Sequence, residues 1–182
     1  SISLSKLRNV TIYMLGEAYK PGSYTISSLS TVTNALFASG GVSESGSLRN
    51  IQIKRNGKLI ETYDFYKFLL FGEGISDTRL QDGDTIYIPF IENTVMLSGA
   101  FKRPYLYEFV IGETISDAID MAGGFISNVS KKPTLELSTI DYDSLKRVNI
   151  YIDGNDSRDR KLLDGDILNV TETYSLSPSI IE

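Results

Sequence analysis

The sequence predicts an α+β protein made of two tandem copies of one module. One set of residues recurs 83 positions later, β-rich runs bounded by turn residues surround each set, and each copy contains one amphipathic helical segment. A fixed internal period indicates a structural unit that is built twice. The recurring pairs are Gly16 and Gly99, Pro21 and Pro104, Tyr24 and Tyr107, Thr31 and Thr114, Ala35 and Ala118, Gly40 and Gly123, and Gly41 and Gly124.

An acidic turn also recurs, one residue out of step with the other pairs, so a single net deletion separates the copies. We therefore expect two domains, 1–92 and 93–182, the second with a C-terminal extension. A short linker at 90–93 should hold the modules close together. The two copies of the turn are Asp82-Gly83-Asp84 and Asp164-Gly165-Asp166.

The first copy begins with two predicted strands at 10–15 and 23–26, rich in β-branched and aromatic residues. Between them, Pro21-Gly22 predicts a type II turn in which glycine supplies the positive φ. A helix should follow at about 31–39, started by Ser30 or Thr31 and ended by the Gly-Gly pair.

The second copy has clearer helix signals at 114–122. Thr114 and Asp117 resemble a capping box, with Asp in place of the usual Glu or Gln. The pair Gly123-Gly124 ends this helix as Gly40-Gly41 ends the first one. Because these glycines follow a helix rather than precede one, we interpret them as caps and not as a phosphate cradle. The predicted buried stripe is Ile115, Ala118, Ile119 and Ala122.

Beyond each helix, three more strands are expected in each copy. In the first, Asn56-Gly57 predicts a tight hairpin, 65–71 predicts a short helical turn, and Pro89 closes the last strand. The order of strand, strand, helix and three strands is a β-grasp (ubiquitin-like) arrangement, with a mixed sheet packed on one helix. The later strands are expected at 51–55, 58–63, 85–88, 135–140, 147–152 and 167–170.

Composition excludes several classes of protein. The chain has no cysteine or histidine, which removes thiolate and imidazole metal sites and Ser-His or Cys-His nucleophiles. Its net charge of −5 gives no basic surface for nucleic acid. No apolar run approaches the roughly 20 residues that span a bilayer, and the start without Met suggests a processed chain or a fragment. We expect a protein that is not an enzyme and has no cofactor.

Several motifs of the first copy follow one order and spacing over about 80 residues. They are Leu-Gly-Glu-Ala-Tyr-Lys-Pro-Gly-Ser-Tyr (15–24), then Thr31, Ala35 and Ser39-Gly40-Gly41, then the string at 80–89. In this the chain resembles the SLBB family, whose name means soluble-ligand-binding β-grasp. The second copy resembles it less completely, because Ala100 replaces Glu17 and Tyr105 replaces Gly22.

Tandem SLBB domains of this kind are typical of bacterial outer-membrane polysaccharide export proteins. The resemblance implies a periplasmic, outer-membrane-associated location and a homo-oligomeric ring in the full-length parent. It also implies other envelope export components as partners, and passage of capsular polysaccharide or exopolysaccharide with weak, transient contacts. Two alternatives stay open: an independent sugar-binding module, and a hydrolase acting on envelope glycans.

The acidic turns could be paired catalytic carboxylates, but no partner group recurs beside them and Asp often caps its own turn. We therefore interpret them as structural. A calcium-loop register at 153–164 lacks the required Gly, because Arg158 stands at position 6. The remaining candidates are aromatic and cationic residues of the two Pro-containing loops, which suit contacts with a glycan or a neighbouring subunit. They are Tyr19, Lys20, Lys102, Arg103 and Tyr105.

Overall fold

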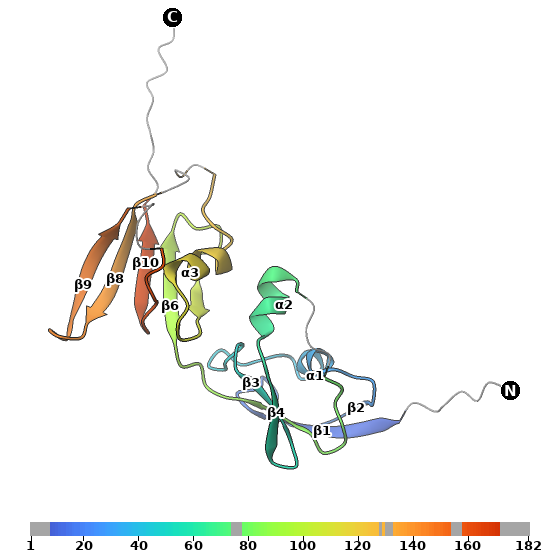
Figure 1. Cartoon of the computed structure of the whole chain (residues 1–182). Coiled ribbons are helices and arrows are strands. Elements are labelled where there is room, and N and C mark those ends of the chain that lie inside the picture. Colours follow the sequence, from blue (N-terminus) through green and yellow to red (C-terminus); the bar gives the residue numbers. More distant parts are fainter. Residues whose placement is uncertain (1–7, 74–77, 128, 130–132, 154–157, 172–182) are drawn as a thin grey trace, which may run out of the picture. The chain divides into compact units, whose positions relative to one another are not determined.

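The computed structural model describes residues 8–73, 78–127, 129, 133–153 and 158–171 (Figure 1). The chain divides into two compact units, Ser1–Glu92 and Asn93–Glu182. Each unit is an α+β structure with a five-stranded mixed sheet. The predicted fold class of two tandem β-grasp modules is confirmed.

The first unit has the strand order β2-β1-β5-β3-β4. Its two central strands, β1 and β5, are parallel, and the other neighbours are antiparallel. A second helix, α2, follows β4 and has no counterpart among the described elements of the other unit. The elements are β1 (Asn9–Gly16), β2 (Gly22–Ser27), α1 (Val32–Ala38), β3 (Ile51–Arg55), β4 (Lys58–Tyr63), α2 (Phe65–Phe71) and β5 (Thr85–Ile88).

The second unit repeats this topology with the order β7-β6-β10-β8-β9. Here β6 and β10 form the parallel central pair, and α3 lies across one face of the sheet (Figure 1). The elements are β6 (Thr94–Gly99), β7 (Leu106–Glu108), α3 (Ile115–Met121), β8 (Leu135–Asp141), β9 (Lys146–Ile152) and β10 (Asp166–Val170).

In each unit, the core forms between one sheet face and the helix α1 or α3, and in the first unit Phe65 of α2 also belongs to it. Alternate residues of β1, Ile12 and Met14, are fully buried, and α1 buries Val32, Ala35 and Leu36 against the same cluster. Because side chains alternate across a strand, the residues between them face the other side of the sheet. That second face remains partly exposed in both units.

The helices α1 and α3 each begin one residue after a recurring threonine, as predicted. The backbone N–H of Thr114 donates to the Asp117 carboxylate (2.7 Å), and the N–H of Thr31 donates to Asn34 Oδ1 (3.0 Å). These bonds satisfy donors at helix starts that have no partner within the helix. At the C-terminal end of α1, the N–H of Gly41 donates to the carbonyl of Leu36 (2.8 Å).

One turn differs from its prediction. Gly22 is the first residue of β2 and has a φ of 155°, whereas a type II turn needs about 80° at this position. Pairing of Met14 with Gly22 extends the β1–β2 ladder as far as this glycine, so strand pairing outweighs the local turn preference. In contrast, Asn56 and Gly57 have φ values of 50° and 74°, which are those of the predicted tight hairpin.

None of the helices in the described residues is long and apolar enough to cross a membrane.

The close approach of the two central strands explains why Gly16 recurs. Gly16 has a φ of 71°, and a Cβ atom built on it would lie 2.2 Å from the carbonyl oxygen of Ile88. We expect Gly16→Ala to lower the free energy of unfolding by more than 2 kcal/mol, on the order of the strain and overpacking costs combined. Urea unfolding monitored by circular dichroism would measure it.

Gly57→Ala is the matched control, because Gly57 has a similar φ of 74° and open space around its Cβ position. It should lose only about 1 kcal/mol from backbone strain. Equal losses in the two variants would contradict a role for close strand approach at Gly16.

Candidate functional site

The first aspartate of each acidic turn ties the turn to the start of the central strand. Asp82 Oδ1 accepts a hydrogen bond from the N–H of Thr11 (2.8 Å), and Asp164 Oδ1 accepts one from the N–H of Thr94 (2.8 Å). The glycine that follows each aspartate donates its N–H to the carbonyl of the same threonine, at 2.8 and 2.9 Å. The turn therefore clamps two segments about 70 residues apart in the sequence.

The second aspartate of each turn is buried. Asp84 Oδ2 accepts from the N–H of Gln81 (2.8 Å), and Asp166 Oδ2 accepts from the N–H of Leu163 (2.9 Å). The side chains are 0% and 2% exposed, respectively. Each of these carboxylates accepts from the backbone N–H three residues before it and so closes the turn by a local side-chain-to-backbone hydrogen bond.

In the first unit, Asp84 also forms an ion pair. Arg55 Nε donates to Asp84 Oδ1 and Arg55 Nη2 donates to Asp84 Oδ2, both at 2.8 Å. The hydrogen bonds that Arg55 donates to Asp84 raise the pKa of Arg55 above its usual value. A bidentate pair of this kind fixes orientation as well as charge, so it holds the end of β3 against the start of β5.

These contacts leave three of the four turn carboxylates, those of Asp82, Asp84 and Asp164, poorly suited to acid–base catalysis. Asp84 accepts hydrogen bonds on both oxygens, from Arg55 and from a backbone N–H. Asp82 and Asp164, which begin the turns, each accept one from a strand N–H group. Within the described residues, no three His, Cys, Asp or Glu side chains lie close enough to hold a metal ion. Residues 155 and 157 of the calcium-loop register lie outside the described residues.

In the first Pro-containing loop, Tyr19 lies over the end of α1. Its ring approaches Gly40 so closely that a Cβ there would meet Tyr19 Cδ1 at 2.8 Å, and its N–H donates to the carbonyl of Gly41 (3.0 Å). Tyr19 remains 62% exposed, with the ammonium of Lys20 5.9 Å from its ring centroid. This loop presents an aromatic face and a cation to solvent.

The second Pro-containing loop is anchored in the same manner to α3. The N–H of Lys102 donates to the carbonyl of Gly124 (2.9 Å), and Arg103 Nη2 donates to the carbonyl of Met121 (2.9 Å) at the end of the helix. Arg103 therefore caps its own helix, where a cation is favourable. Tyr105 is 73% exposed and Lys102 is also exposed.

The recurring tyrosines close these loops. Tyr24 Oη donates to the carbonyl of Lys20 (2.7 Å), and Tyr107 Oη donates to the carbonyl of Arg103 (2.8 Å). Burial raises the pKa of Tyr107, and the nearby guanidinium of Arg103 partly opposes this shift. Both loops are thus held by hydrogen bonds within their own unit, and their candidate contact residues stand on a fixed backbone.

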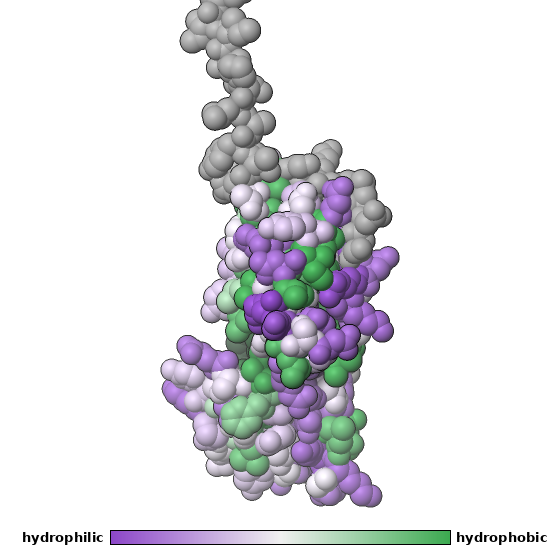
Figure 2. All heavy atoms as spheres, turned by 90° about the vertical axis from the view of Figure 1, so that its left-hand side faces the viewer, coloured by the Kyte–Doolittle hydropathy of each residue, from purple (hydrophilic) through white to green (hydrophobic). Residues whose placement is uncertain are grey.

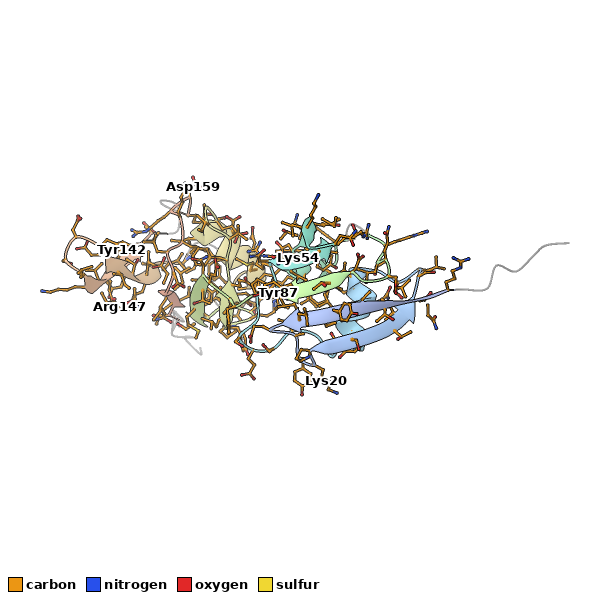
Figure 3. The ribbon with its side chains drawn as sticks, turned by 90° about the horizontal axis from the view of Figure 1, so that it is seen from below. Lys20, Lys54, Tyr87, Tyr142, Arg147 and Asp159 are labelled. Carbon is orange, nitrogen blue, oxygen red and sulfur yellow. The ribbon has the colours of Figure 1, made fainter. Side chains whose placement is uncertain are left out.

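Sequence reasoning missed the outer face of each sheet. In the first unit, Tyr13 and Leu15 are exposed there, and the ammonium of Lys54 lies 4.5 Å from the ring centroid of Tyr87 (Figure 3). The alternation of polar and apolar residues in the sequences of β1 and β3 could have predicted this exposed face. This face offers flat aromatic surface and a cation.

The outer face of the second unit carries a row of polar side chains across four strands. Ser98 Oγ donates to Asn169 Oδ1 (3.1 Å), and Glu136 accepts from Asn169 Nδ2 (3.5 Å) and from Asn149 Nδ2 (3.2 Å). Tyr151, on the edge strand β9, is 72% exposed. Hydroxyl, amide and carboxylate groups in a row suit hydrogen bonding to a polar polymer.

The comparison with protein families gives the class of the chain. The SLBB domain model matches residues 11–62 and 94–134, one segment in each unit and just over half of the chain. The chain belongs to the SLBB domain family.

Among known proteins, two sequences from Escherichia coli that both carry the name polysialic acid transport protein KpsD are similar to this chain. Each is 33% identical over 109 residues, which cover 59% of this chain and 19% of the relative. The chain thus spans about a fifth of the length of the relatives that it matches.

The ion pair predicts unequal roles for the two aspartates of the first turn. We expect Asp84→Ala to lower the free energy of unfolding by about 3 kcal/mol, because it leaves Arg55 without its partner next to the core. Asp82→Ala, which removes one hydrogen bond at an exposed position, should cost about 1 kcal/mol. Urea denaturation of both variants would measure the difference, and equal losses would argue against the ion pair as the main contribution.

The raised pKa of Tyr107 predicts a pH-dependent contribution to stability. The hydroxyl is held protonated in the folded unit, so its contribution is complete below the unfolded pKa of about 10 and is lost as pH rises through the folded pKa. Tyr107→Phe should be less stable than wild type by about 1 kcal/mol at pH 7. This gap should shrink above pH 10, and urea titrations from pH 7 to 11 would measure it. A gap that stays constant up to pH 11 would contradict the shift.

Proposed function

We propose that the chain is the repeat portion of an outer-membrane capsular polysaccharide or exopolysaccharide export protein. In the full-length parent it acts in the periplasm as a scaffold that forms a ring around the passing polymer. The observation that carries this proposal is the tandem SLBB repeat, together with 33% identity to a polysialic acid transport protein over 109 residues.

The geometry supports a role without catalysis. The buried aspartates bind turn backbone and, in the first unit, an arginine. The exposed aromatic and cationic residues lie on loops and sheet faces, where contacts with a neighbour or a ligand are made. A scaffold needs such contact surfaces on rigid modules, and both Pro-containing loops are fixed to helix ends.

Charge supports weak contact with the polymer. Polysialic acid is polyanionic, and the chain has a net charge of −5, so overall electrostatics disfavour tight binding of a polymer of that class. Lys20 and Lys102 offer local cations on the two loops. On the face shown in Figure 2, hydrophilic and hydrophobic residues are interspersed over the described part of the chain. Weak, mixed contacts of this kind let a polymer pass without being held.

The proposal predicts weak self-association of the isolated chain. Each module is small and a ring contact is heterologous, so other parts of the parent are expected to help set the rotation. We expect a monomer in equilibrium sedimentation at micromolar concentration. A stable closed oligomer of the chain alone would show instead that these modules suffice for ring formation.

The proposal also predicts weak glycan affinity. Titration with sialic acid oligomers should give a dissociation constant near the millimolar range, equivalent to about 4 kcal/mol. The double variant Lys20→Gln with Lys102→Gln should weaken binding several-fold at low salt, while the fold stays intact. Neutral dextran is the matched control ligand. Sub-micromolar binding of one defined sugar would refute the scaffold and favour an independent sugar-binding module.

A further inference from the structure

The two units differ at one equivalent position beside the buried aspartate. In the first unit, Lys54 pairs with Thr85, so the next residue, Arg55, lies across from Asp84. In the second unit, Ser138 pairs with Ile167, which places Thr139 across from Asp166. A short hydroxyl side chain therefore stands where the first unit has a guanidinium group.

This exchange leaves two buried oxygen atoms without partners. Thr139 and Asp166 are 1% and 2% exposed, and neither Thr139 Oγ1 nor Asp166 Oδ1 has a hydrogen-bond partner among the described residues. The nearby Arg147 donates instead to the carbonyls of Ser138 and Gly165. An unpaired buried carboxylate oxygen is costly, and a charged donor would offset that cost.

An open cavity of about 390 Å³ has Thr139 in its wall. Asp166 does not line this cavity and is buried next to Thr139, across the β8–β10 ladder. The cavity lies between the β8–β9 hairpin and the segment that contains Leu163, with Tyr142 near the hairpin tip (Figure 3). Two carboxylates, Asp141 and Asp143, line it, together with the aliphatic side chains of β9. Asp141 also accepts hydrogen bonds from the N–H of Asp143 (3.2 Å) and from Ser144 Oγ (2.6 Å). Carboxylates and an aromatic ring favour a cation, and the aliphatic wall suits an apolar stem.

We propose that this cavity binds a guanidinium group on an aliphatic stem, with Asp166 and Thr139 as its recognition residues. The guanidinium occupies the place that Arg55 takes in the first unit, donating to Asp166 Oδ1 and Thr139 Oγ1. Because both oxygens are buried and Asp166 does not line the cavity, entry requires a rotamer change of Thr139. The group comes from an arginine side chain of another polypeptide or from a small guanidino compound, and the site does not depend on the proposed role in export.

Two-dimensional ¹⁵N NMR titration of the full chain tests the proposal. The probes are ethylguanidinium chloride and the tripeptide acetyl-Gly-Arg-Gly-amide, each compared with sodium chloride at equal ionic strength. We expect saturable shifts at the amides of Thr139, Leu163 and Asp166, with a dissociation constant in the millimolar range. Tighter binding of the tripeptide would identify an arginine side chain as the source, and tighter binding of ethylguanidinium would identify a small compound.

Two variants use the repeat as its own control. Thr139→Arg carries the first unit's arginine into the second unit, so it should raise the midpoint of thermal unfolding and abolish probe binding. Arg55→Thr should create a second site, with new probe-dependent shifts at Gln81 and Asp84. Asp166→Asn, where it folds, should weaken binding at least tenfold.

Arg160 also lines the cavity and, with Arg147, is an internal competitor for the same carboxylate. If Arg160→Gln binds the probes and wild type does not, Arg160 fills the site and the proposal is wrong. Shifts in wild type that match those of sodium chloride, or that persist unchanged in Thr139→Arg, would also overturn it.

Discussion

The acidic turn before the last strand of each unit is the constraint on which the fold depends. It joins the first strand of the unit to the last strand, across about 70 residues of sequence. The links are a hydrogen bond to an aspartate carboxylate and a hydrogen bond between a glycine N–H and a threonine carbonyl. The central parallel pairs, β1 with β5 and β6 with β10, begin at this clamp. The other strands of each sheet join that pair by antiparallel ladders, and α1 or α3 covers one face of the sheet.

One difference between the units lies next to this clamp. Both units keep the backbone bonds of the turn, but among the described residues only the first unit pairs its buried aspartate with an arginine. The backbone role is required by the topology and so is retained twice, whereas the second carboxylate oxygen is available for a different partner. A repeat protein can in this way hold one fold constant while one copy acquires a separate recognition site.

The candidate contact residues stand on parts of the module that are held by hydrogen bonds. Each Pro-containing loop is fixed to the end of its helix by main-chain bonds and by a recurring tyrosine hydroxyl. The outer sheet faces display their side chains from paired strands. Rigid modules with exposed polar and aromatic surface suit a scaffold, because ordering such groups costs little when a partner or polymer arrives.

Local sequence patterns were enough to predict the helices, the strands and their repetition. The helices lie within one residue of their predicted bounds, and the Asn-Gly hairpin has its predicted geometry, because capping and tight turns depend on neighbouring residues. Only the tertiary structure decided the partner of Asp84, the capping role of Arg103 and the polar row through Glu136 and Asn169. The turn at Gly22 was predicted wrongly because pairing of β1 with β2 decides its conformation. These features depend on strand register and on contacts between distant segments, which no local pattern in the chain encodes.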